Sequence, residues 1–290
     1  MFASFQFQGL IDQALQEDIG TGDLSSSIVS DNLTGLAKLY AKKQGIVAGI
    51  FIAEQTFLRV DPGINVNRLG KDGDEVKPGD VVLELNGALN SFLQAERTAL
   101  NFIQHLSGIA TATKRAVDLV SGFPVKIIDT RKTLPGLRTL QKYAVRVGGG
   151  SNHRFGLYDA VLLKDNHLWA VGGITEAFRL IRNEVGHMVK IQIECESMEQ
   201  IREAIACGAD TILLDNMNPE QMREAVQFIN GRAVVEASGG ITEDNLRQVA
   251  ASGVNLISMG ALTHSVQVLD FSLDFGDIKA NTKRQLTMNN

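Results

Sequence analysis

The sequence predicts an α/β protein in which a domain of parallel strands follows a smaller α+β domain. From about residue 125 onward, short apolar segments alternate with segments of helical periodicity, which is typical of strand–helix–strand units. The first hundred residues contain Gly-rich turns between shorter apolar segments instead. Near the C-terminus, apolar and polar residues alternate with the period of a half-buried strand.

The N-terminal domain is expected to begin with a helix over residues 7–17 and to continue with a strand near residues 36–42. Residues 73–83 predict a turn-rich hairpin, because Gly and Pro separate two short apolar segments.

Two helical segments, over residues 92–106 and 109–120, should link this domain to the next. The alternating residues 269–275 predict a strand that returns to the N-terminal sheet, and residues 279–290 a frayed tail. We therefore expect an N-terminal domain over residues 1–107, completed by a strand within 266–290, and a parallel domain over residues 108–265.

Six apolar segments in the second domain predict buried strands, each ending on a polar residue: Asp129, Lys164, Glu194, Asp215, Glu236 and Ser258. Parallel strands with right-handed crossovers close into a barrel or form an open sheet. Six strands do not support a complete eight-stranded barrel. In a parallel barrel the functional residues lie at the carboxyl ends of the strands.

The composition excludes several classes of function. The 290 residues are 44% hydrophobic with a net charge of −5, so the chain as a whole should bind neither nucleic acid nor anionic membranes. The first residues lack the pattern of a secretory signal, and no apolar run is long enough to span a membrane. Cys195 and Cys207 lack the spacing of a zinc site and predict buried thiols in a reducing compartment. A cytoplasmic protein is expected.

A cluster of basic residues stands out against this acidic background. Residues 126–167 contain eight Lys or Arg and three acids, a net +5 that leaves −10 for the rest of the chain. Five members of the cluster lie next to strand ends: Arg131, Lys132, His153, Arg154 and Lys164. Converging guanidinium and ammonium groups suit a small, multiply anionic substrate.

Three other basic residues, Arg138, Lys142 and Arg146, are spaced four apart. That spacing indicates a solvated helix face.

Glycines and acids complete the candidate site. The segment Ser238-Gly239-Gly240 follows the fifth predicted strand and Gly260 follows the sixth, where such barrels commonly hold a phosphate on backbone N–H groups. Glu194 and Asp215 lie on adjacent strand ends and could hold ribose hydroxyls or position Mg²⁺ at a polyphosphate. Internal pairing with neighbouring Lys or Arg is the alternative for both acids.

Several longer motifs match one known family. They are residues 17–24 (EDIGTGDL), 96–101 (ERTALN), 105–111 (HLSGIAT), 129–138 (DTRKTLPGLR), 148–154 (GGGSNHR), 163–167 (LKDNH) and 238–241 (SGGI). Through these motifs the chain resembles the quinolinate phosphoribosyltransferases, also called nicotinate-nucleotide pyrophosphorylases (carboxylating), over nearly its whole length.

The resemblance implies a fold, an assembly and a reaction. The fold is an incomplete parallel α/β barrel (TIM-like) with an N-terminal α/β open-faced sandwich, assembled at least as a dimer. The reaction transfers a phosphoribosyl group from phosphoribosyl pyrophosphate to quinolinate with decarboxylation, and gives nicotinate mononucleotide for NAD biosynthesis.

The resemblance also implies roles for individual residues. Arg97 would reach into the pocket of the neighbouring subunit, while the two carboxylates of quinolinate would be held by Arg131, His153, Arg154 and Lys164. The residues around phosphoribosyl pyrophosphate would be Lys132, Glu194, Asp215, Ser238, Gly239, Gly240 and Gly260, and Thr130 would also bind substrate. Glu194 and Asp215 would position Mg²⁺, either directly or through substrate or water. The catalytic groups would be Lys132, Lys164, Glu194 and Asp215.

Three other functions compete with this one. A related pyrophosphorylase linked to molybdenum transport would share the fold, and a barrel lyase could use Lys164 as a Schiff-base amine. The predicted hairpin at residues 73–83 resembles part of a biotinyl or lipoyl carrier domain. His105 and His264 receive no role, and His167 is interpreted as a cap of the Asp165-Asn166 turn.

Overall fold

The computed structural model describes residues 5–30 and 33–275 and divides the chain into two compact units. Unit 1 contains residues 1–111 and 266–290, and unit 2 contains residues 112–265. The expected frayed tail at 279–290 lies outside the described residues.

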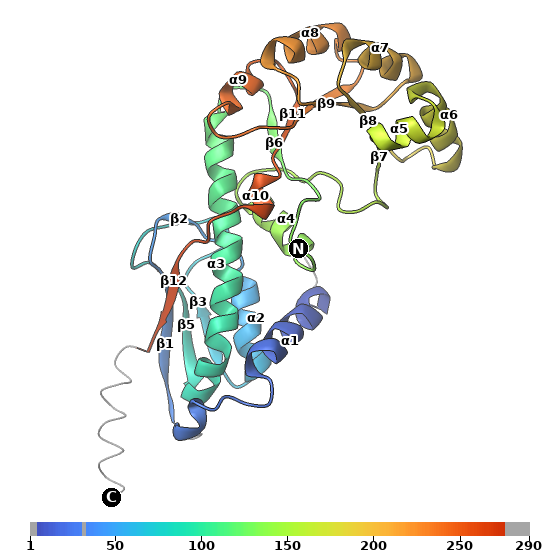
Figure 1. The fold of residues 1–290 in the computed structure, drawn as a ribbon. Helices are drawn as coiled ribbons and strands as arrows, with labels where there is room; N and C mark the ends of the chain where they lie inside the picture. Colours follow the sequence, from blue (N-terminus) through green and yellow to red (C-terminus); the bar gives the residue numbers. More distant parts are fainter. Residues whose placement is uncertain (1–4, 31–32, 276–290) are drawn as a thin grey trace, which may run out of the picture. The chain divides into compact units, whose positions relative to one another are not determined.

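A four-stranded antiparallel sheet with the order β12-β1-β5-β3 forms the centre of unit 1 (Figure 1). Its strands are β1 (Thr34–Ala41), β3 (Asn65–Arg68), β5 (Val81–Ala88) and β12 (Phe271–Asp274). Alternate residues of β1 are buried, since Ala37, Leu39 and Ala41 all point into the core. The late strand β12 pairs with β1, with Leu273 opposite Leu39.

Two helices supply the other side of this core. α2 (Ile50–Val60) contributes Phe57 and α3 (Leu89–Leu119) contributes Phe92, and the two rings meet edge to face with centroids 6.4 Å apart. α1 (Phe5–Ile19), which covers the predicted helix at 7–17, and the short 3₁₀ turn η1 (Ser26–Ile28) precede the sheet.

The hairpin predicted for residues 73–83 is wrong. β4 (Glu75–Val76) pairs with β2 (Gly45–Ile46), whereas β5 pairs with β1 and β3. The turn between them, closed by the Asp80 amide on the Lys77 carbonyl at 3.0 Å, therefore carries the chain from one sheet to another. This pairing removes the basis for the carrier-domain interpretation.

The two helices predicted over 92–106 and 109–120 form one continuous helix, α3. The expected break fell at Ser107-Gly108. Gly108 serves packing instead, because a Cβ atom at this position would lie 2.3 Å from the Gln267 carbonyl oxygen. The glycine thus lets the segment that leads into β12 pass directly over the helix.

Unit 2 contains a six-stranded parallel sheet with the order β6-β11-β10-β9-β8-β7. The strands, which match all six predicted apolar segments, are β6 (Lys126–Ile128), β7 (Val161–Leu163), β8 (Ile191–Cys195), β9 (Thr211–Asp215), β10 (Val234–Ser238) and β11 (Leu256–Ser258). β6 and β7 form the two edges, so six strands leave the barrel incomplete.

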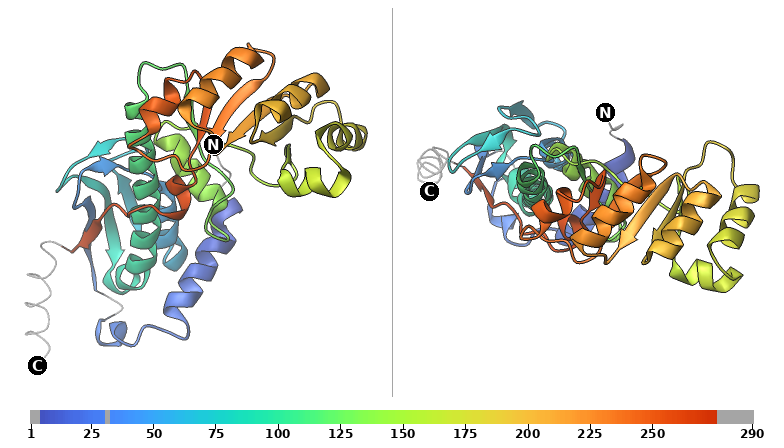
Figure 2. Two further views of the ribbon diagram at one scale, coloured as in Figure 1. Left: turned by 45° about the horizontal axis from the view of Figure 1, so that its top comes forward. Right: turned by 90° about the horizontal axis from the view of Figure 1, so that it is seen from above.

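Helices cover the outer side of this curved sheet (Figures 1 and 2). The helices on this side are α6 (Ile174–Glu184), α7 (Met198–Cys207), α8 (Pro219–Ile229) and α9 (Leu246–Ala250). The other helices of unit 2 are α4 (Arg138–Val147), α5 (Asp165–Val171) and α10 (Ala261–His264). α8 begins where its sequence favours a helix start, because the Asn218 side chain accepts the Gln221 amide and Pro219 occupies the first turn. Among the described residues, no helix has the length and apolar character needed to cross a membrane.

Candidate active site

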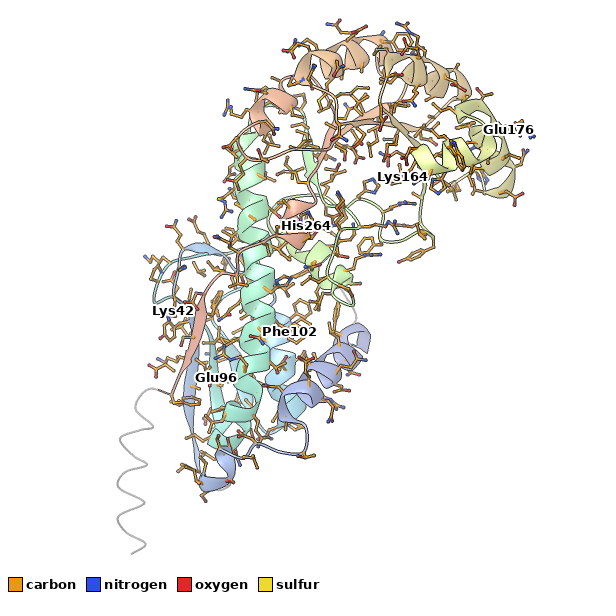
Figure 3. The ribbon with its side chains drawn as sticks, viewed as in Figure 1. Lys42, Glu96, Phe102, Lys164, Glu176 and His264 are labelled. Atoms are coloured by element: carbon orange, nitrogen blue, oxygen red, sulfur yellow. The ribbon has the colours of Figure 1, made fainter. Side chains whose placement is uncertain are left out.

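The polar ends of the parallel strands meet along one edge of the unit 2 sheet. Asp215 pairs in register with Ser238 on β10, and Cys195, next to Glu194, pairs with Leu214 on β9. Lys164 directly follows β7 and opens α5 (Figure 3). Because all six strands are parallel, this is the carboxyl edge, where barrel enzymes place their active sites.

Lys164 and two carboxylates form the charged centre of this edge. Lys164 Nζ lies 2.9 Å from Glu194 Oε2, and the Glu194 side chain is only 12% exposed. Burial, together with the charges of Glu194 and Glu196, raises the pKa of Asp215, while Lys164 and Lys132 act in the opposite direction. Glu194 thus makes the internal pair considered from the sequence, and Asp215 lies in the same charged cluster.

Arg154 and Arg131 form a second cationic region. Burial lowers the pKa of Arg154, and the nearby charge of Arg131 lowers it further. Arg154 donates through Nη1 to the Ala160 carbonyl at 2.8 Å, but its buried Nε has no hydrogen-bond partner among the described residues. Two adjacent guanidinium groups with an unsatisfied donor are suited to bind an anion.

The loop after β6 holds Lys132 in place. The Lys132 amide donates to Thr130 Oγ1 at 3.0 Å, and the Thr263 hydroxyl donates to the Lys132 carbonyl at 2.6 Å. The Lys132 side chain passes Gly260, whose added Cβ would lie 3.0 Å from Lys132 Cδ. Thr130, Lys132 and Gly260 are therefore neighbours, although they come from opposite ends of unit 2.

The solvated helix face predicted for Arg138, Lys142 and Arg146 is wrong for the first two residues. Lys142 is fully buried in an ion pair with Asp129 and donates to the His153 carbonyl at 3.0 Å. Burial lowers the pKa of Lys142 against the effect of Asp129. Arg138 donates to Thr133 Oγ1 and to the Phe155 carbonyl, both at 3.0 Å. Spacing alone did not reveal that α4 directs these cations toward the site loops.

His153 is held by its backbone and by its ring. Its amide donates to Asp129 Oδ1 at 2.8 Å, its Nδ1 accepts the Arg154 amide at 2.7 Å, and its Nε2 lies 3.0 Å from Gln192 Oε1. Gln192 and Glu236, which the sequence analysis did not single out for the site, are buried polar residues on β8 and β10. Gln192 was visible in the sequence as a polar residue inside an otherwise apolar strand, whereas Glu236 was expected at a strand end and instead lies in the middle of β10.

The glycine loop after β10 is shaped by Asn216, a residue that the sequence analysis missed. Asn216 adopts a left-handed conformation with φ 53°, donates its amide to the Ser238 carbonyl at 3.0 Å and donates through Nδ2 to Asp215 Oδ2 at 2.7 Å. Gly239 has φ +89°, and a Cβ there would lie 2.2 Å from Asn216 Oδ1. Gly239 and Gly240 then lead into α9.

A cavity of about 390 Å³ lies in unit 2 beside the Arg154 loop. Its polar lining includes His153 and Arg154 in the loop and Gln192 and Glu236 on the strands, together with Asn152, Asp159, Lys190 and Thr211. It is large enough for a small polar ligand or several water molecules.

The remaining histidines and Arg97 occupy separate positions. His167 accepts the Lys164 amide on Nδ1 at 3.0 Å, which confirms its interpretation as a cap. Arg97 is an exposed residue of α3 in unit 1, whereas the other predicted site residues belong to unit 2. His264 is on α10, with Nε2 about 3.1 Å from the position of a Cβ on Gly260 (Figure 3).

An incomplete parallel barrel with cations and carboxylates gathered at its strand ends defines an α/β-barrel enzyme for a multiply anionic substrate. The family model described as "Quinolinate phosphoribosyl transferase, C-terminal domain" matches residues 109–274, and the corresponding N-terminal domain model matches residues 23–107. The chain belongs to the quinolinate phosphoribosyltransferase family.

Known relatives match along most of their length. The probable nicotinate-nucleotide pyrophosphorylase [carboxylating] of Bacillus subtilis is 48% identical over 93% of both chains. Its namesake in Methanocaldococcus jannaschii is 42% identical over 91% of this chain and 95% of its own. The crystal structure of NadC from Streptococcus pyogenes superposes with a TM-score of 0.92 at 40% identity, covering 94% of this chain and 97% of that one.

Proposed function

We propose that this protein transfers the phosphoribosyl group of phosphoribosyl pyrophosphate to quinolinate and releases pyrophosphate and CO₂, which gives nicotinate mononucleotide for NAD biosynthesis. The observation that carries the proposal is that unit 2 contains both an unsatisfied, cationic Arg131/Arg154 region and the Lys164/Glu194/Asp215 cluster at the carboxyl ends of its strands. The first suits a dicarboxylate, and the second suits a ribose beside its leaving group. The family and its named relatives support the same reaction.

Quinolinate would bind at the cationic region. Arg131, Arg154 and Lys164 supply guanidinium and ammonium groups for the two carboxylates, with His153 beside them as the family resemblance implies. Two planar guanidinium groups fix a planar dicarboxylate in orientation as well as position. Arg97 would contribute from a second subunit, so the proposed assembly is at least a dimer.

Phosphoribosyl pyrophosphate would lie across the neighbouring strand ends. Glu194 and Asp215 offer oxygens to the ribose hydroxyls, and Thr130, Ser238, Gly239, Gly240 and Gly260 surround the phosphate groups. Backbone N–H groups in such a loop stabilise anions without a charged side chain. Lys132 would neutralise the charge that develops on the departing pyrophosphate.

The acids also suit Mg²⁺. Mg²⁺ sites in phosphate chemistry use one or two carboxylates together with substrate oxygens, and the raised pKa of Asp215 beside Glu194 indicates carboxylates that a cation would stabilise. No group of three or more His, Cys, Asp or Glu in the described part of the chain could hold a metal alone. Bound Mg²⁺ would therefore use Glu194 and Asp215, directly or through water, and would supply charge neutralisation at the pyrophosphate.

The chemistry needs no covalent intermediate with the protein. The C–O bond to pyrophosphate breaks, the pyridine nitrogen forms the new C–N bond, and the ring becomes cationic. The adjacent carboxylate then leaves as CO₂, because the cationic nitrogen stabilises the carbanion until it takes a proton. The protein binds and orients both substrates and holds the second carboxylate in place.

The competing functions find less support. Lys164 lies against a carboxylate and is 45% exposed, whereas a Schiff-base lysine is activated in an apolar pocket or beside another cation. The family models and relatives carry the names of quinolinate enzymes, which does not favour the paralogue linked to molybdenum transport. We also propose a cytoplasmic location for the protein.

The test is to incubate the purified protein with quinolinate, phosphoribosyl pyrophosphate and MgCl₂ and to follow nicotinate mononucleotide and pyrophosphate. Arg131→Ala and Lys164→Ala should raise the KM for quinolinate or lower turnover when phosphoribosyl pyrophosphate is saturating. Unchanged kinetics in both variants would contradict the assigned roles. Turnover of nicotinate in place of quinolinate would overturn the proposed substrate.

A further inference from the structure

A chain of buried polar side chains crosses the interior of unit 2 beneath the Arg154 loop. Glu236 on β10 is 2% exposed and Gln192 on β8 is 7% exposed. Gln192 Nε2 donates to Glu236 Oε2 at 2.7 Å, and Gln192 Oε1 lies 3.0 Å from His153 Nε2. These hydrogen-bonded side chains therefore link the middle of the sheet to His153, a residue of the proposed quinolinate site.

Both ends of this chain place the ring proton of His153 on the same atom. The Arg154 amide can only donate, so Nδ1 of His153 must accept and Nε2 must carry the proton. At the other end, Glu236 Oε2 accepts from the Gln192 NH₂ group, so Gln192 turns its oxygen toward His153. The Glu236 carboxylate and the Arg154 amide thus fix one direction of hydrogen bonding.

We infer that Glu236 is a positioning residue which, through Gln192, holds the His153 ring in its Nε2–H tautomer and thereby aligns the peptide that carries Arg154 in the quinolinate site. The inference rests on the proposed function for its kinetic consequences. Its structural part, the tautomer of His153, does not depend on activity.

Three further contacts favour this role over simple packing. The backbone on either side of the ring is already tied down, because Asp129 accepts the His153 amide and Lys142 donates to the His153 carbonyl. The His153 carbonyl and the Arg154 amide belong to one planar peptide, so Lys142 and the ring nitrogen Nδ1 of His153 hold this peptide from its two sides. Glu236 Oε2 also lies only 3.5 Å from His153 Nε2, so this oxygen favours a proton on Nε2 directly as well as through Gln192.

The second oxygen of Glu236 faces a cavity. Glu236 Oε1 has no protein partner among the described residues, and Glu236 lines the same cavity of about 390 Å³ as Arg154 and His153. A buried carboxylate oxygen without a protein partner is costly unless water reaches it. The cavity can supply that water.

The test uses substitutions that keep volume and change only hydrogen-bond direction. In Glu236→Gln, residue 236 can donate as well as accept, so Gln192 can flip. The His153 ring can then take the Nδ1–H tautomer as well, at the cost of the hydrogen bond from the Arg154 amide. The KM for quinolinate should rise at least about tenfold, since a small misplacement of a binding group is costly, while the KM for phosphoribosyl pyrophosphate stays within about twofold. A general disturbance of β10, which ends at Ser238, would change both constants.

The reciprocal variant provides a rescue. In Gln192→Glu/Glu236→Gln, a carboxylate at 192 accepts from both His153 Nε2 and the new amide, so one direction of bonding is restored. The KM for quinolinate should return to within about threefold of the unsubstituted protein. Ser252→Ala, which removes another buried side-chain hydrogen bond in unit 2, is the control and should leave both KM values unchanged.

The ¹⁵N shifts of the His153 ring provide a readout without activity. The unsubstituted protein and the reciprocal variant should show a single Nε2–H tautomer, and Glu236→Gln a mixture. A single unchanged tautomer with unchanged KM values in folded Glu236→Gln would overturn the inference, as would a reciprocal variant that folds but is not rescued. If the unsubstituted protein made no nicotinate mononucleotide, the proposed function would fail while the ring shifts still tested the positioning.

Discussion

Lys142 on α4 and Asp129 after β6 form an ion pair in which neither side chain is exposed to solvent. Asp129 also accepts from Asn152 Nδ2 at 2.6 Å and from the His153 amide at 2.8 Å. Lys142 closes the arrangement from the helix side by donating to the His153 carbonyl. The pair therefore anchors the loop that carries His153 and Arg154.

Lys142→Met should destabilise the protein strongly. Removing one partner of a buried ion pair leaves the other charge uncompensated, which typically costs about 3–5 kcal/mol. The free energy of unfolding from urea titrations measures the loss. Arg146→Met, four residues further on the same helix and exposed, is the matched control and should change stability by no more than about 0.5 kcal/mol. Equal losses of unfolding free energy in Lys142→Met and Arg146→Met would contradict a stabilising role for the buried ion pair.

Gly239→Ala should impair the reaction more than the fold. The Cβ would meet Asn216 Oδ1 and displace either the glycine loop or the hydrogen bond from Asn216 to Asp215. A displacement of about 1 Å at a binding loop can cost about 10²-fold in kcat/KM.

Gly231→Ala separates this clash from backbone strain. Gly231 has φ +75° but nothing lies within 4 Å of an added Cβ, so the substitution carries the strain of about 1–2 kcal/mol without the collision. Its kcat/KM should stay close to that of the unsubstituted protein, while its unfolding free energy falls. Similar kcat/KM values in the two variants would argue against a role for the Asn216 contact.

Cys195 should resist alkylation in the folded protein. Burial, with smaller effects of Glu194 and Glu203, raises the pKa of this thiol to about 12, and the side chain is fully buried. At about pH 8 the reactive thiolate would be a fraction of about 10⁻⁴. Cys207 is partly exposed, contrary to the expectation that both thiols are buried, so it should react first with iodoacetamide. Peptide mass spectrometry would identify the site, and comparable labelling of Cys195 without urea would contradict the prediction.

The strands and their polar ends could be predicted from sequence because each depends on a short local pattern. All six parallel strands appear where apolar segments predicted them, from Lys126–Ile128 to Leu256–Ser258. Features that depend on distant partners could not be predicted in this way. The pairing of β4 with β2 and the continuity of α3 past Gly108 are both decided by segments far along the chain.

The same limit applies to the site. Basic residues next to strand ends were recognisable, since their position alone suggests the carboxyl edge. Lys142, Gln192 and Glu236 were not, because a charged or polar side chain inside a regular element becomes meaningful only when its buried partner is known. The sequence thus predicted the groups expected to meet substrate better than the groups that hold them in place.

Asp215→Asn should stabilise the protein and reduce its activity. The pKa of Asp215 is raised above its usual value near 3.8 by burial and by the charges of Glu194 and Glu196. A carboxyl group with a higher pKa in the folded than in the unfolded state lowers stability when ionised, and this penalty fades as the pH falls through the raised pKa toward the usual value. Asp215→Asn should therefore raise Tm at about pH 7.5, and the gain should shrink toward about pH 4. Formation of nicotinate mononucleotide should fall by about 10²-fold, because a proposed ribose contact is lost.

Asp210 immediately precedes β9, at the end of the strand opposite Asp215. Asp210→Asn is the control, for which the opposite change in Tm is expected. Burial acts to raise the pKa of Asp210, but hydrogen bonds from Lys190 at 2.6 Å and from the Ile191 amide at 2.9 Å lower it overall. Its ionised form therefore stabilises the fold, and Asp210→Asn should lower Tm at about pH 7.5, with the loss fading only as the pH falls below about 4 through the lowered pKa. Measuring Tm as a function of pH for both variants tests both predicted directions of the change in Tm. A lower Tm for Asp215→Asn at neutral pH would contradict the claim that this carboxylate is held at the site at a cost in stability.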